Sequence, residues 1–98
     1  MNKSFRALRT ANVPTRVQGH IYYALLNRKH SSPEMIRMCE RAIEDVCKDP
    51  YDQKMLKEYV STEKSSDLIS LDYHTCKRRL HNLYYAYVNR VYYLMCSS

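Results

Sequence analysis

The feature that most constrains this chain is an apolar stripe near its C-terminus that repeats with the period of an α-helix. Its members are separated by four, three, four, four and three positions: Cys76, Leu80, Leu83, Tyr87, Val91 and Leu94. Five steps therefore span eighteen residues, which is the spacing of about 3.6 residues per turn that an α-helix requires. The stripe predicts one long amphipathic helix over residues 73–96, with this side buried.

Composition extends the helical prediction to the whole chain. One glycine and three prolines among 98 residues argue against a fold of strands and tight turns, which needs many sharp reversals. Leu, Met, Lys, Arg and Glu are abundant, and these residues lose little side-chain freedom in a helix. We therefore expect an all-α protein: a basic N-terminal arm over residues 1–14, then a single five-helix domain over residues 15–98.

Helix starts can be located from capping residues followed by proline. A first helix is expected over residues 15–29. Ser32-Pro33 and Asp49-Pro50 each combine a side-chain acceptor with a proline at the first helical position, which predicts the starts of a second and a third helix. A short fourth helix is expected over residues 63–69. Apolar spacing marks the buried sides of the second and third helices: Ile36, Cys39, Ile43 and Val46, then Met55, Leu56, Tyr59 and Val60.

The junction before the long helix has the punctuation of a helix-turn-helix over about residues 51–83. An apolar Ile69 ends one helix, a three-residue turn carries Leu71 inward, and Asp72 is expected to cap the next helix. Such a helix suits the major groove of DNA when cations lie on its free face. An ordinary solvated helix face is the alternative for the basic triplet at residues 77–79. The expected DNA-binding residues are His74, Lys77, Arg78 and His81 for base edges, and Thr75, Arg79 and Asn82 for phosphates.

Net charge favours an anionic partner. The chain has a formal charge of +6, and its first eighteen residues contain four cations and no acid. Nucleic acid is the first candidate for such an uneven distribution, and no membrane partner is expected. The arm residues that could contact DNA are Lys3, Arg6, Arg9 and Arg16.

Six of the ten tyrosines lie at or after residue 73, more than a core helix needs. Tyrosine is enriched where proteins meet, because it offers a large area at low entropic cost. We expect a homodimer or partner surface; stacking on single-stranded RNA is the weaker alternative. The expected surface residues are Tyr85, Val88, Tyr92, Tyr93 and Met95.

Other chemistry has little support in the sequence. The four cysteines form no CxxC pair, so a structural zinc site is not expected. There is no glycine-rich phosphate loop and no nucleophile motif, so we expect neither an enzyme, nor a cofactor, nor a metal. Cys39 and Cys76 fall on predicted apolar faces, as reduced thiols of a cytoplasmic protein do. No apolar run approaches the roughly 20 residues that cross a bilayer.

Residues 34–83 resemble the sigma-region-4-like module of phage late-transcription regulators of the ArpU/RinA type. The similarity lies in Met-Leu-Lys-Glu-Tyr-Val at residues 55–60, Ile-Ser-Leu-Asp at 69–72 and Thr-Cys-Lys-Arg-Arg-Leu at 75–80. The resemblance implies a DNA-binding transcriptional regulator of a phage or mobile element, acting in the host cytoplasm, with RNA polymerase as a further candidate partner. The main alternative is a small helical inhibitor or adaptor of a mobile element that binds a host protein or ribonucleoprotein.

Overall fold

The computed structural model describes residues 5, 7–8 and 12–97, and within them the chain forms five α-helices, one short 3₁₀ helix and no strand. The elements are α1 (Thr15–Leu26), η1 (Arg28–His30), α2 (Pro33–Val46), α3 (Pro50–Ser61), α4 (Ser66–Asp72) and α5 (Lys77–Ser97). This confirms the prediction of an all-α domain with a long C-terminal helix. Within the described residues, no helix is both long enough and apolar enough to span a membrane.

Capping side chains fix the starts of α2 and α3 at the positions that the sequence predicts. The Ser32 hydroxyl accepts a hydrogen bond from the Met35 amide, and proline occupies the first position of α2. The Asp49 carboxylate accepts from the Tyr51 amide in the same way at the start of α3. Both starts agree with the sequence, because each cap satisfies an amide that has no partner within its own helix.

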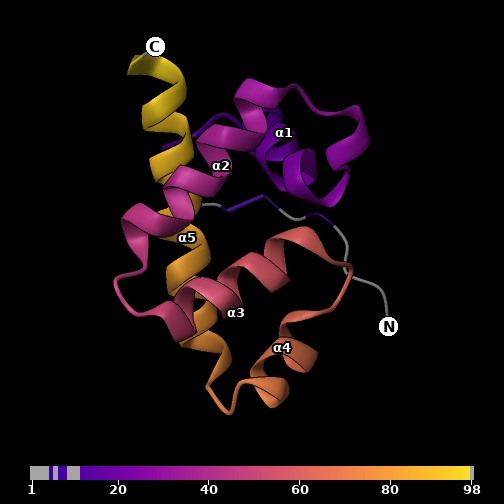
Figure 1. The fold of residues 1–98 in the computed structure, drawn as a ribbon, viewed down its shortest axis with the longest axis vertical. Coiled ribbons are helices and arrows are strands. Elements are labelled where there is room, and N and C mark those ends of the chain that lie inside the picture. The colour runs from indigo at the N-terminus through magenta and orange to yellow at the C-terminus, as the bar shows by residue number, and fades with distance from the viewer. Residues whose placement is uncertain (1–4, 6, 9–11, 98) are drawn as a thin grey trace.

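Helix α5 packs against all four other α-helices. In Figure 1 it runs from the lower end of the view to the top, with α1 and α2 beside its upper part and α3 and α4 beside its lower part. Its buried side carries Leu80, Tyr84, Tyr87, Val88 and Val91. Burying each large apolar side chain contributes roughly 1.5–3 kcal/mol, so this one helix face organises most of the core.

A second, smaller cluster of buried residues lies under the junction of α3, α4 and α5. It consists of Met55, Ile69, Tyr73 and Leu80, each no more than 8% exposed. Because these four residues come from α3, α4, the following turn and α5, the cluster fixes how α4 and the start of α5 are held against α3.

The described part of the N-terminal arm packs against α1. The Phe5 ring lies 5.3 Å from the Tyr22 ring. The Gln18 amide accepts from the Leu8 amide at 2.7 Å and donates to the carbonyls of Leu8 and Val13. Apolar contact and a buried glutamine hold this segment. Three of the predicted arm contacts, Lys3, Arg6 and Arg9, lie outside the described residues; Arg16 is exposed on α1.

Candidate nucleic-acid interface at the start of α5

The turn between α4 and α5 begins three residues later, and ends four residues later, than the sequence predicted. Helix α4 continues to Asp72, and α5 begins at Lys77 rather than at residue 73. Asp72 therefore does not cap α5. The start of α4 is displaced as well, because the Ser65 hydroxyl accepts from the Leu68 amide. This cap starts α4 at Ser66, three residues after the expected position, and α4 ends correspondingly later.

His74 provides the backbone reversal at the end of α4. It is the one described non-glycine residue with a positive φ, 51°. The Thr75 amide donates to the Ser70 carbonyl at 3.0 Å and the His74 amide to the Leu71 carbonyl at 3.3 Å. This pair of bonds is a Schellman motif, which terminates a helix through one left-handed residue. Histidine tolerates that conformation better than most side chains do.

The later register changes which side chains are buried near the turn. Leu71 is 71% exposed, so the prediction of a buried turn leucine is wrong. Cys76 is also exposed, because it precedes α5 instead of belonging to its apolar side. The buried residues near the turn are instead Ile69 of α4 and Tyr73, the residue that caps the C-terminus of α4 one helical turn later.

Glu58 of α3 holds this turn through a small polar network. Its carboxylate accepts from the Lys64 ammonium at 2.7 Å and from the Tyr73 hydroxyl at 2.9 Å. Lys64 also reaches Asp72, at 3.3 Å. The hydrogen bonds from Lys64 and Tyr73 lower the pKa of Glu58. Burial, together with the Glu58 charge, raises the pKa of Tyr73 to about 12. Finally, the Tyr51 hydroxyl donates to the Tyr73 carbonyl at 2.6 Å.

The three cations that open α5 have different surroundings. The Arg79 guanidinium donates to the Asp52 carboxylate at 2.6 Å, and Asp52 is only 8% exposed. Lys77 forms an ion pair with Asp67 at 3.0 Å on the surface. Within the described part of the chain, Arg78 forms no ion pair or side-chain hydrogen bond and is exposed. Arg79, one of the expected phosphate contacts, thus ties α5 to α3.

An exposed polar face remains at the N-terminal end of α5, and we call it the α5 face. It is formed by Arg78 and by His81 and Asn82, which follow Arg78 by three and four positions; all three are exposed, whereas Leu80 is buried. His74 is exposed and Thr75 half-buried in the preceding turn. Of the seven predicted DNA-binding residues, these three share one helical face, His74 and Thr75 border it, and Lys77 and Arg79 are engaged in ion pairs.

The predicted partner surface on the second half of α5 is only partly exposed. Tyr85 and Tyr93 are exposed, whereas Tyr92 and Met95 are half-buried. Val88 is fully buried, so its assignment to this surface is wrong: it joins the apolar side that faces the core.

Asp52, Glu58 and Tyr73 carry the structure of this region, and sequence reasoning gave none of them that role. Asp52 lies in the first turn of α3, where the positive end of the helix dipole already favours an acid. Its partner Arg79 is 27 positions away, a separation at which a single sequence carries no pairing signal. The available sequence signal is the position of Asp52, three and four residues before the apolar Met55 and Leu56 on the same side of the helix.

The last observations concern metal binding and similarity to known proteins. The described residues contain no group of three or more His, Cys, Asp or Glu side chains that could hold a metal ion. Comparison with protein-family models, curated proteins and solved structures finds no match to this chain.

Proposed function

We propose that this protein is a DNA-binding transcriptional regulator that reads duplex DNA through α4, the 73–76 turn and the start of α5, acting as a helix-turn-helix. The resemblance of residues 34–83 to phage late-transcription regulators supports an origin in a phage or mobile element. On this proposal it is not an enzyme, and it acts in the cytoplasm of the host. Its buried thiols, Cys39 and Cys47, support a reducing compartment.

The observation that carries the proposal is the free guanidinium of Arg78 on the α5 face. Its neighbours Lys77 and Arg79 are neutralised by Asp67 and Asp52, whereas Arg78 lies exposed beside His81 and Asn82. An arginine at the N-terminal end of a helix can donate two bonds to a guanine edge in the major groove, and asparagine can pair with adenine. The formal charge of +6 adds general attraction to phosphate.

We further propose that the protein acts as a homodimer through the second half of α5, where Tyr85 and Tyr93 are exposed. A two-fold dimer of this kind recognises half-sites about one helical turn of DNA apart. Light scattering after size exclusion tests this part. A monomer at high protein concentration would contradict it.

Binding of fluorescently labelled duplex DNA across a salt series tests the proposal. Affinity should fall steeply between about 50 and 200 mM salt, because released counterions drive the association. Arg78→Ala should weaken binding by roughly tenfold or more, which corresponds to one good base contact of about 1–3 kcal/mol. Arg41→Ala is the matched control, since Arg41 is an exposed arginine on α2.

A second candidate function is that of a small inhibitor or adaptor of a mobile element that binds a host protein. It is favoured by the exposed leucines of α4, Leu68 at 44% and Leu71 at 71% exposure. Large apolar side chains next to each other on a surface are typical of a protein contact. Absence of duplex binding even at low salt would reject the DNA proposal in favour of this one.

A further inference from the structure

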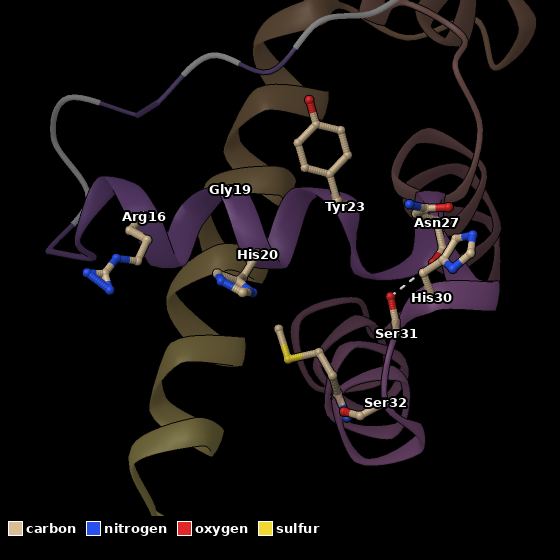
Figure 2. A pocket seen from close by; sticks show the side chains of 9 residues that line it. Arg16, Gly19, His20, Tyr23, Asn27, His30, Ser31 and Ser32 are labelled. Carbon is tan, nitrogen blue, oxygen red and sulfur yellow. Dashed lines mark hydrogen bonds between the residues drawn. The ribbon is translucent and has the colours of Figure 1, made fainter.

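A basic cleft opens between α1 and α2, apart from the α5 face. Its volume is about 610 Å³, within the range of small-molecule sites. Figure 2 shows it from close by: Arg16 and His20 lie one turn apart on α1, and Ser32 marks the start of α2. In Figure 1, α1 lies toward the upper end of the molecule and the 73–76 turn at the lower end. The inference is therefore independent of the proposed DNA contact.

The lining of this cleft favours an anion. Arg16, His20 and His30 line it, and no lining residue carries a carboxylate. Within the described part of the chain, Arg16 forms no ion pair or side-chain hydrogen bond. The one acid in the first turn of α2, Glu34, lines a different groove, beside Leu94 of α5. The cleft thus gathers donors and positive charge without an internal counterion.

The start of α2 strengthens this preference. Helix α2 is fourteen residues long, and its N-terminal Ser32 and Met35 line the cleft. The N-terminus of a helix carries a partial positive charge, which favours a phosphate placed nearby. This contribution adds to the charge of Arg16 and would not define a site by itself.

Gly19 supplies a separate observation. It is the only glycine in the chain, it lies in the middle of α1, and it lines the cleft. Glycine weakens a helix interior relative to alanine. Among the described atoms, a Cβ at this position would approach the Phe5 ring no closer than 3.8 Å, an ordinary contact. The fold therefore accommodates alanine here, with its Cβ beside the Phe5 ring at the border of the cleft.

We propose that this cleft binds a small phosphorylated ligand, with Arg16 and His20, one turn apart on α1, holding the phosphate and Gly19 leaving room beside them. The half-exposed ring of Tyr23, which also lines the cleft, offers a flat surface for a planar group on the same ligand. A nucleoside monophosphate combines both features. Free inorganic phosphate shares the anionic part of this chemistry and is the second probe.

Titration of amide chemical shifts in the full chain with AMP, inorganic phosphate and adenosine tests the proposal. Probe concentrations up to about 10 mM detect dissociation constants into the millimolar range. AMP and phosphate should both shift the amides of α1 and of the start of α2, whereas adenosine alone should bind at least tenfold more weakly than AMP. Equal binding of AMP and adenosine would overturn recognition through phosphate. An absence of shifts with both AMP and phosphate would overturn the site.

Two variants test the residues. Arg16→Gln should weaken AMP binding about tenfold or more, as loss of a charged hydrogen bond does. The control Arg41→Gln, an exposed arginine beside the other groove, should leave it unchanged. Gly19→Ala should raise the Tm by a few degrees, roughly 3–6 °C for a domain of this size, and weaken AMP binding. If Gly19→Ala raises the Tm and leaves AMP binding unchanged, glycine serves no ligand and the proposal fails.

Discussion

At the residue scale, adjacent side chains with the same charge have different tasks. Arg78 and Arg79 are neighbours in sequence, yet Arg79 bonds to the nearly buried Asp52 at 2.6 Å while Arg78 remains free. The sequence identifies both as cations on a helix. It does not identify the partner of Arg79, because that partner lies on another helix and the pairing depends on the packed fold. Arg79 therefore contributes to stability, whereas Arg78 is available for binding.

Alanine substitution should lower the stability of the protein at Arg79 and leave it nearly unchanged at Arg78. Arg79→Ala leaves the Asp52 carboxylate without its cation and should lower the free energy of unfolding by about 1–3 kcal/mol. Arg78→Ala should change it by less than about 0.5 kcal/mol, as exposed substitutions usually do. Urea denaturation of both variants measures the difference. Equal stability of the two variants would contradict the assignment of Arg79 to a structural pair.

Two buried tyrosines give a second contrast at this scale. The Tyr73 hydroxyl donates to the Glu58 carboxylate at 2.9 Å, whereas the Tyr87 hydroxyl is buried beside the Cys39 thiol, a weak partner. Tyr73→Phe should therefore cost about 1–2 kcal/mol of stability, because a hydrogen bond to a charged group is lost. Tyr87→Phe should cost less than about 0.5 kcal/mol. Thermal unfolding compares them, and the reverse order would refute the network at Glu58.

At the element scale, the sequence predicts helix starts where one strong cap is followed by proline, as at Ser32 and Asp49. It also predicts much of the buried side of α5, because the 3.6-residue period is long: Leu80, Tyr87 and Val91 are buried as expected. It misses the buried Tyr84 and Val88. The limits of α4 are different. Hydroxyl-bearing residues stand at 61, 62, 65 and 66, so several caps compete locally. Tertiary packing of Ile69 and Tyr73 against Met55 and Leu80 selects the later register.

Substitutions at His74 test that register directly. Because His74 adopts a φ of 51°, glycine there should keep or raise stability, by up to about 1 kcal/mol. Valine, which is β-branched, should lower it by about 1–2 kcal/mol. If α5 instead began at residue 73, glycine would fall inside a helix and would cost up to about 1 kcal/mol. The sign of the change for His74→Gly, read from chemical denaturation, decides between the two registers.

At the scale of the whole molecule, the core is rich in groups that resist ionisation. Burial raises the pKa of Tyr22 to about 12 and the pKa values of Cys39 and Cys47 to about 11. It also raises the pKa values of Tyr84 and Tyr87. The folded state therefore favours the neutral forms of these residues, which would ionise near their ordinary values of 9.0 and 10.0 once unfolded.

The pH dependence of stability follows from these shifts. A folded pKa raised above the unfolded value gives a contribution that is complete below the unfolded pKa and is lost as the pH rises toward the folded one. The free energy of unfolding should thus fall progressively above pH 9 to 10. Circular dichroism melts across this range measure it, with tyrosinate absorbance recorded in parallel. Undiminished stability at about pH 11 would contradict the burial of these groups.

The most direct test of the central claim, that the α5 face reads DNA sequence, is selection of bound duplexes from a random pool. The natural chain should enrich one motif, and Arg41→Ala should enrich the same motif. Arg78→Ala should lose preference at one or two adjacent positions of that motif while retaining the others, because a single base contact has been removed. Failure to enrich any motif, or an unchanged motif with Arg78→Ala, would contradict the account.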